Sequence, residues 1–340
     1  MTLDQQQQVI RLKDALATPG RIVITNHQGP DGDAMGALTA LYQFLRKKGY
    51  EVAMITPNDY PEFLHWLPCT DETINFMRQK ELATATIEKA DYIFHLDYSQ
   101  IKRSADMIRL LSESKAVRIL IDHHPEPSLS ADYLFSDTNA SSTCELLFDM
   151  LKIWDAALID RDIASCLYTG IMTDTGCFSF RSATSYTFTT VSELLAYGID
   201  RDAIYDQVYD NFSAQRMRLM GYCLNNKMEV FPEYHTAIIS LNLEEQRRYD
   251  FVTGDSEGFV NLPLSVNGVR FTAFFLEKED KIKISFRSKG SFSVNNFARK
   301  HFKGGGHLNA SGGEIRISLD ETVKKFRELL PLYKNELHAP

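Results

Sequence analysis

One histidine and two aspartates stand close together near the start of the chain, at His27, Asp31 and Asp33. The apolar run 21–25 before them is typical of a buried strand, and the leucines that follow recur at helical spacing as far as residue 47. A strand-to-helix turn therefore carries one imidazole and two carboxylates, which are ligands that suit a hard or borderline divalent metal. An aspartate in such a turn can also simply cap the helix, so the metal interpretation depends on similar residues downstream.

Similar residues follow at three later places, each at the end of a predicted strand or helix. Asp97 follows one apolar run, and Asp174 ends a short helical segment. Asp122, His123 and His124 follow another apolar run. Strands that alternate with helices predict a parallel α/β sheet, and ligands gather where the carboxyl ends of parallel strands meet. We therefore expect these side chains to converge. The candidate metal ligands are His27, Asp31, Asp33, Asp97, His123 and Asp174.

These six side chains can form two mixed shells, each with about one imidazole and two or three carboxylates. Such shells suit Mn²⁺, with Mg²⁺, Co²⁺ or Zn²⁺ as alternatives. Two ions about 4 Å apart that share a carboxylate and a hydroxide are a standard device for hydrolysing phosphoesters. The sequence contains neither a Walker loop nor a nucleophile elbow, so covalent catalysis is not indicated.

The length of 340 residues favours two domains, and the chain changes character along its length. Strand and helix patterns alternate over 1–184, the stretch 185–227 looks helical and amphipathic, and β-rich runs follow. We predict an α/β fold with a parallel-sheet N-terminal catalytic domain over 1–184 and a helical linker over 185–227. A smaller α+β domain that binds substrate would occupy 228–340.

The second half of the chain carries a local basic segment. Residues 281–303 include seven lysines and arginines and no acidic residue, and Gly304-Gly305-Gly306-His307 follows directly. Consecutive glycines let backbone amides approach an anion closely, and the basic residues supply the counter-charge. A flexible loop beside a solvated basic face would give the same pattern. Because the basic, glycine-rich segment occurs together with an acidic metal centre, we favour an anionic substrate. The second domain would bind this substrate, and the metal ions of the first would promote its hydrolysis.

Composition narrows the class of substrate and the location. The formal net charge is 37 − 45 = −8, so the chain lacks the extended basic surface that long duplexes reward, and small anionic substrates fit better. The five cysteines form no Cys-x-x-Cys pair, which favours free thiols in a reducing compartment. We find no signal peptide and no membrane-length apolar run, and we expect a cytoplasmic protein with no membrane partner.

Taken together and in this order, the motifs resemble those of the DHH phosphoesterase superfamily. The resemblance rests on His27-x-x-x-Asp31-x-Asp33, Asp97, Asp122-His123-His124 and Asp174. Arg287 and Gly304-Gly305-Gly306-His307 resemble the signature of the type 1 DHH-associated domain. The subgroup most similar to the chain is that of stand-alone nanoRNases (oligoribonucleases), which are also pAp phosphatases.

The resemblance implies a role for each matched residue. His27 and Asp31 would bind one ion, Asp33, His123 and Asp174 the other, and Asp97 would bridge the two. Asp122 would orient a histidine, and His124 would contact the scissile phosphate or protonate the leaving oxygen. The expected substrate-binding residues, which would hold a terminal phosphate or end nucleotide, are Arg287, Gly304, Gly305, Gly306 and His307.

The same resemblance implies hydrolysis of short oligoribonucleotides to 5′-mononucleotides and of 3′-phosphoadenosine 5′-phosphate (pAp) to AMP. The partners would be short single-stranded RNA or small nucleotides, and a homodimer would be compatible with the sequence. The main alternative is a cyclic or linear dinucleotide phosphodiesterase. A RecJ-like single-strand DNA exonuclease would need further domains, and the glycine-rich motif argues against an exopolyphosphatase or inorganic pyrophosphatase. A nucleotide sensor without catalysis is disfavoured because every proposed ligand is present.

Three further residues or segments need the structure to interpret them. Tyr98 stands where the family usually has a small hydroxyl residue, and Ser311 stands where alanine is common, so substrate details are open. Ser142-Thr143-Cys144-Glu145 has the form of a helix capping box, whose hydroxyls could also face the site.

Overall fold

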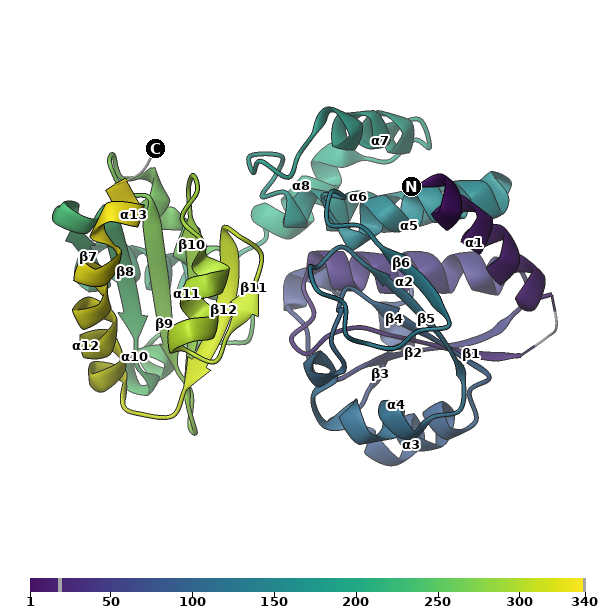
Figure 1. Cartoon of the computed structure of the whole chain (residues 1–340), viewed down its shortest axis with the longest axis horizontal. Coiled ribbons are helices and arrows are strands. Elements are labelled where there is room, and N and C mark those ends of the chain that lie inside the picture. The colour runs from purple at the N-terminus through teal and green to yellow at the C-terminus, as the bar shows by residue number, and fades with distance from the viewer. Residues whose placement is uncertain (18–19, 339–340) are drawn as a thin grey trace. The chain divides into compact units, whose positions relative to one another are not determined.

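The computed structural model describes residues 1–17 and 20–338 and consists of two compact units, Met1–Asn211 and Phe212–Pro340. Each unit combines helices with a sheet (Figure 1), and the first sheet is parallel. The predicted α/β fold, with a parallel N-terminal sheet and a second sheet in the C-terminal region, is therefore confirmed. No helix within the described residues is long and apolar enough to cross a membrane.

The first sheet has the strand order β3-β2-β1-β4-β5-β6. The first strand, β1, lies in the middle of the sheet. Strands β2 and β3 are added on one side of it, and the chain then crosses over to add β4, β5 and β6 on the other side. In parallel sheets with such a reversal, ligands bind at the carboxyl ends of the two strands beside it, here β1 and β4. The strands are β1 Arg21–Thr25, β2 Glu51–Thr56, β3 Ile74–Asn75, β4 Tyr92–Leu96, β5 Val117–Asp122 and β6 Tyr133–Ser136.

Helices cover both faces of this sheet (Figure 1). Ile22 and Ile24 of β1 pack into one core with α1, α2, α5 and α6, whereas Val23 between them packs into a second core with α3 and α4. This alternation is the two-residue period of a strand that is buried on both faces. The helices are α1 Leu3–Ala15, α2 Gly32–Lys47, α3 Lys80–Glu88, α4 Ile108–Glu113, α5 Thr143–Asp155 and α6 Arg161–Asp174.

Helices α2 and α6 pack very closely because small residues lie between them. A Cβ atom at Gly36 of α2 would lie 2.5 Å from the carbonyl oxygen of Cys166 on α6, and one at Gly170 of α6 would lie 2.8 Å from Asp33 Oδ1 on α2. A larger side chain at either position would force the helices apart. The close packing places the start of α2, with Asp31 and Asp33, beside the end of α6.

The segment 185–227 is divided between the two units. Helices α7 Ser185–Leu195 and α8 Arg201–Tyr209 belong to the first unit. Helix α9 Ala214–Tyr222 and the π-helical turn Cys223–Lys227 belong to the second. The segment is thus helical over most of its length, and the division between the compact units falls in the loop between α8 and α9.

The second unit contains a mixed sheet with the order β11-β12-β10-β9-β8-β7, in which β8 and β9 pair in parallel and the other neighbours are antiparallel. Phenylalanines from the sheet and two helices form its core, among them Phe271, Phe286, Phe297 and Phe326. The strands are β7 Met228–Phe231, β8 Thr236–Leu241, β9 Phe271–Glu277, β10 Ile282–Ser288, β11 Gly305–Gly306 and β12 Ala310–Ile315. The helices are α10 Leu243–Arg248, α11 Val294–His301, α12 Leu319–Leu329 and α13 Lys334–His338.

Candidate metal centre

His27 and Asp97 meet at the carboxyl ends of β1 and β4, where the strand order reverses. His27 Nε2 lies 3.3 Å from Asp97 Oδ2 and 3.8 Å from Asp31 Oδ2. Asp31 is also the N-cap of α2, since its Oδ1 accepts hydrogen bonds of 3.1 Å from the amides of Asp33 and Ala34. One oxygen of Asp31 therefore caps the helix and leaves the other to face His27. The capping and metal interpretations of this aspartate are compatible.

A second group of side chains forms around His123, directly after β5. His123 Nε2 lies 3.4 Å from Asp174 Oδ2, 3.7 Å from Asp97 Oδ1 and 3.9 Å from Asp33 Oδ2. Ligand atoms of Asp33, His123 and Asp174 lie within 4.8 Å of one another, and so do those of His27, Asp31 and Asp97. The structure thus brings all six candidate ligands together in two adjacent sets of three.

The start of α5 holds two of the carboxylates in place. Asp33 accepts hydrogen bonds from the amides of Thr143, at 2.6 Å, and Cys144, at 2.9 Å, so it sits on the positive end of this helix. The hydroxyl of Thr143 donates a 2.9 Å hydrogen bond to Asp97 Oδ1. The capping box predicted here forms only in part, because Ser142 caps the helix while the Glu145 carboxylate binds Ser141 instead.

The ring orientations of both histidines fit metal binding. His27 Nδ1 lies 2.9 Å from the carbonyl oxygen of Gln28, and His123 Nδ1 lies 3.3 Å from that of Ala140. A carbonyl oxygen can only accept, so Nδ1 carries a hydrogen in each ring and Nε2 is the nitrogen directed at the carboxylates. Backbone partners of this kind usually fix metal-binding histidines. His27 Nε2 is moreover buried without a hydrogen-bond partner in the described part of the chain.

The electrostatics of the cluster also favour a bound cation. Burial, together with the charges of Asp97 and Asp174, raises the pKa of Asp33 well above its usual range. Burial alone would raise the pKa of Asp97 as well, but the imidazoles of His27, His124 and His123 hold it far below its usual range. Burial would lower the pKa of His123, yet Asp174, Asp97 and Asp33 raise it to about 9. The carboxylates therefore compete for positive charge that divalent ions would supply.

His124 lies beside the two sets and has other partners. Its Nδ1 lies 2.7 Å from Asp122 Oδ1, and its Nε2 lies 3.1 Å from Arg103 Nη1. Burial and the charge of Asp97 raise the pKa of Asp122, which is completely buried, to about 7. Asp122 thus orients His124, and the guanidinium of Arg103 faces the same ring on its other side.

Two residues of this site were not among the predicted ones. Arg103 lies on the 3₁₀ segment Ile101–Met107 that follows β4, and its carbonyl oxygen accepts a 2.7 Å hydrogen bond from the amide of Gln28 in the first motif. An arginine six residues after Asp97 gave no sequence signal, because no periodic pattern marks that segment. Thr143 lies in the expected capping sequence, whose hydroxyls could also face the site, and this was the sequence signal for its contact with Asp97.

The glycine-rich motif of the second unit has a packing explanation at two of its three glycines. A Cβ atom at Gly304 would lie 2.0 Å from the carbonyl oxygen of Gly312, and one at Gly306 would lie 2.5 Å from that of Ala310. Gly306 also has a φ of 148°, which side chains disfavour. At Gly305 the nearest atoms would be 3.8 Å away. Packing therefore requires Gly304 and Gly306 but leaves the glycine at 305 unexplained.

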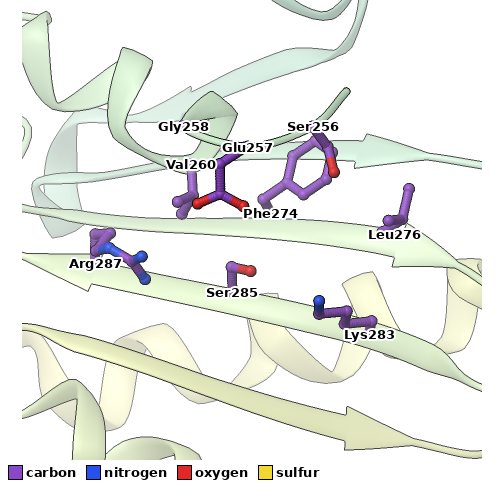
Figure 2. Close-up of a pocket in the computed structure, with 9 residues that line it drawn as sticks. All are labelled: Ser256, Glu257, Gly258, Val260, Phe274, Leu276, Lys283, Ser285 and Arg287. Atoms are coloured by element: carbon purple, nitrogen blue, oxygen red, sulfur yellow. The ribbon is translucent and has the colours of Figure 1, made fainter. Parts of the chain in front are cut away.

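Arg287 lies on β10, whose side chains alternate between the two faces of the second sheet. Ile282, Ile284 and Phe286 point into the phenylalanine core. Lys283, Ser285 and Arg287 line a cavity on the opposite face (Figure 2).

At the end of the glycine motif, the amide of His307 donates a 2.8 Å hydrogen bond to the carbonyl oxygen of Ala310, and Ser311 Oγ donates one of 3.0 Å to that of His307. Ser311 therefore supports the loop rather than facing outward.

Comparisons with known proteins identify both units. Residues 21–171 match the model of the DHH family, N-terminal domain, and residues 237–331 match the DHHA1 domain. The bifunctional oligoribonuclease and PAP phosphatase NrnA of Bacillus subtilis is 30% identical over 92% of this chain and 95% of its own. The protein of the same name from Thermus thermophilus is 29% identical over 92% of this chain and 90% of its own.

Solved structures agree with this assignment. A crystal structure of an exopolyphosphatase-related protein from Bacteroides fragilis is 42% identical, covers 98% of each chain, and has a TM-score of 0.93. The Mn²⁺ complex of RecJ from Thermus thermophilus is 15% identical and has a TM-score of 0.58 over 99% of this chain and 55% of that one, which shows a shared fold. The chain belongs to the DHH family of metal-dependent phosphoesterases and carries a C-terminal DHHA1 domain.

Proposed function

We propose that the chain hydrolyses very short oligoribonucleotides to 5′-mononucleotides and removes the 3′-phosphate of pAp. Two observations support this proposal together. The two adjacent sets of three ligands suit a two-ion phosphoesterase, and relatives that match nearly the whole chain are named oligoribonuclease and PAP phosphatase. The substrates are thus short single-stranded RNA and small nucleotides. All five cysteines are free thiols, which favours a cytoplasmic location.

The proposed cofactor is a pair of divalent ions, with Mn²⁺ as the best fit to mixed imidazole and carboxylate ligands. His27 and Asp31 would hold one ion, Asp33, His123 and Asp174 the other, and Asp97 would serve as a ligand to both. When bound, such ions lower the pKa of a water molecule and neutralise charge on the phosphoryl oxygens. Thr143 and the α5 amides keep Asp97 and Asp33 from rotating away from these positions.

His124 is the proposed proton donor to the leaving oxygen. Its hydrogen bond to Asp122 fixes the ring with the hydrogen on Nδ1, and Nε2 accepts a hydrogen bond from Arg103, so Nε2 would take up and donate a proton only once the phosphate has drawn the guanidinium away. Nε2 is then the atom that meets the substrate. Arg103 reaches the same atom and has four further N–H groups, so its guanidinium can hold the oxygens of the phosphate beside His124.

We assign catalysis to the N-terminal domain, proposed as 1–184, and substrate binding to the C-terminal domain, proposed as 228–340, with a helical linker over 185–227. Arg287 would supply counter-charge for a terminal phosphate or end nucleotide. The glycines of Gly304–His307 would let the same group approach the backbone closely, and the lack of a packing requirement for glycine at 305 supports this role. The affinity for short substrates would then depend on the second domain, and the chemistry on the first.

A parallel assay with Mn²⁺ tests the proposal. It offers a labelled RNA trimer, an RNA 20-mer, pAp, a cyclic dinucleotide and polyphosphate, each with an EDTA control. We expect rapid release of mononucleotide from the trimer, phosphate release from pAp, and slow or no attack on the 20-mer. Polyphosphate is included because a solved structure with 42% identity is described as exopolyphosphatase-related.

The other outcomes assign different functions. Cleavage of the cyclic dinucleotide alone would replace the proposal with a signal-degrading phosphodiesterase. Release of phosphate from polyphosphate alone would make the chain an exopolyphosphatase. Metal binding without turnover of any of the five substrates would favour a nucleotide sensor.

A further inference from the structure

Asp97 has a backbone conformation that glycine adopts easily and aspartate only occasionally. Its φ is +63°, in the left-handed region, although it directly follows the regular strand β4. This conformation is unfavourable for a residue with a side chain and persists only where surrounding contacts enforce it. The amide of Asp97 still donates a 3.0 Å hydrogen bond to the carbonyl oxygen of Ile121 on β5, so the strand pairing continues to this point.

The side chains on either side of Asp97 are hydrogen-bonded to each other. The hydroxyl of Tyr98 lies 2.5 Å from Nδ1 of His95, and their rings meet edge to face with centroids 5.5 Å apart. Both side chains are buried, with exposed fractions of 0% for Tyr98 and 1% for His95. His95 Nε2 has no hydrogen-bond partner among the described residues, so the hydrogen bond between Nδ1 and the Tyr98 hydroxyl orients the ring.

This hydrogen bond depends on the conformation of Asp97. In an extended strand, side chains three residues apart point to opposite faces of the sheet, so His95 and Tyr98 would not meet. The left-handed turn at Asp97 brings the two to the same side. The hydrogen bond and the turn therefore support each other, and the free energy of the bond offsets that of the strained backbone.

Tyr98 also connects this turn to the segment that follows Asp122-His123-His124. Its ring packs with Leu120 and Leu129 in a small buried cluster. The next residue, Ser99, accepts hydrogen bonds of 2.9 Å from the amides of Ser128 and Leu129 through its carbonyl oxygen. The segment after Asp97 and the segment after His124 are therefore held together on the protein side of the site.

We infer that Tyr98 and His95 act as positioning residues that hold the Asp97 carboxylate between the two sets of metal ligands. The inference rests on the proposed function only in treating this cluster as a metal centre. It also explains why a tyrosine at this position is compatible with the site, since the side chain points into the protein and not toward the substrate.

Mn²⁺ binding to the metal-depleted full chain tests the inference without substrate. We expect Tyr98→Phe, measured by titration calorimetry, to weaken at least one Mn²⁺ site about tenfold, which is the usual cost of removing an outer partner. Turnover at limiting Mn²⁺ should fall, excess Mn²⁺ should restore most of it, and KM for the RNA trimer should stay unchanged. Tyr42→Phe is the matched control, because it removes the hydroxyl of another buried tyrosine in the same unit, one that donates to Glu72.

A second pair of variants keeps the test decisive if Tyr98→Phe does not fold. His95→Gln keeps a polar group for the Tyr98 hydroxyl, whereas His95→Leu does not, so only the leucine variant should lose Mn²⁺ affinity. Parental Mn²⁺ affinity in Tyr98→Phe, or equal loss in both His95 variants, would overturn the inference. A parent chain that binds Mn²⁺ but cleaves neither RNA nor pAp would overturn the proposed function instead, and the variants would still decide the role of Tyr98.

Discussion

The two carboxylate oxygens of Asp97 face two different histidines: Oδ2 lies 3.3 Å from His27 Nε2, and Oδ1 lies 3.7 Å from His123 Nε2. The first histidine follows β1 and the second follows β5, so Asp97, after β4, stands between them in the strand order. No other carboxylate in the described residues is paired with both rings within 4.0 Å.

Asp97→Asn should therefore weaken the binding of both proposed ions, because Asp97 is a proposed ligand of each. The amide keeps the size of the side chain and tolerates the left-handed backbone, but it replaces one anionic oxygen with a donor that repels a cation. We expect turnover to fall more than about 100-fold, beyond the usual cost of losing an outer partner. Asp202→Asn, at an exposed position on α8, should leave turnover unchanged. Near-parental activity in a folded Asp97→Asn protein would contradict the bridging role.

His124→Ala should separate chemistry from metal binding. Because His124 bonds to Asp122 and Arg103 and belongs to neither set of proposed ligands, the variant should bind Mn²⁺ like the parent. Loss of the proton donor should lower kcat by about 10²–10⁴-fold. Metal content by elemental analysis and kcat for the RNA trimer are the two measurements. Loss of Mn²⁺ would show that His124 is itself a ligand.

Metal binding should become tighter as the pH rises from 7 to 9. The pKa of His123 is about 9 in the folded metal-free chain, against 6.5 in the unfolded chain, so its ring is protonated at pH 7. That proton must leave before Nε2 can bind a cation. Calorimetry in two buffers of different ionisation enthalpy should detect proton release at pH 7, and less of it in His123→Gln. An affinity for Mn²⁺ that does not change with pH would contradict this account.

The raised pKa of His123 also makes the metal-free protein less stable at alkaline pH. A histidine whose pKa is raised by folding contributes stability that is complete below pH 6.5 and is lost as the pH rises through about 9. Asp122 acts in the same direction, because its pKa is raised from 3.8 to about 7 and its contribution is lost as the pH rises through that value. The Tm of the metal-free chain should fall between pH 6 and 9, and Mn²⁺ should reverse this fall.

Gly305→Ala and Gly304→Ala should have different effects. A methyl group at 305 meets no protein atom closer than 3.8 Å, so the Tm should stay unchanged while KM for the RNA trimer rises. A methyl group at 304 would collide with the Gly312 carbonyl oxygen, so the Tm should fall by several degrees. If Gly305→Ala leaves KM unchanged, the glycines serve packing alone.

The sequence was sufficient to predict the elements that position the site. Buried strands such as 21–25 have an unambiguous apolar pattern, and the residues at their ends carry the ligands. The parallel sheet then requires those ends to meet, so the convergence of His27, Asp97 and His123 could be predicted from pattern and topology alone. The tight packing of α2 on α6 depends on Gly36, but no pattern in the sequence indicates that this glycine lies between two helices.

Other features depend on contacts between distant segments, which no local pattern carries. Arg103 reaches His124 across 21 positions, and its segment has no periodicity. Glu145 binds the amide and hydroxyl of Ser141 rather than the Ser142 amide that would complete the capping box, and the Asp33 carboxylate from a distant helix takes the amides of Thr143 and Cys144. The left-handed conformation of Asp97 is likewise not marked in the sequence, since aspartate adopts it only occasionally.

A titration of Mn²⁺ into the metal-depleted chain, with mononucleotide release from an RNA trimer as the readout, tests the central claim most directly. The account predicts little turnover at one equivalent, a steep rise between one and two equivalents, and complete loss on adding EDTA. Full turnover at one equivalent, or turnover that persists in EDTA, would contradict a two-ion phosphoesterase.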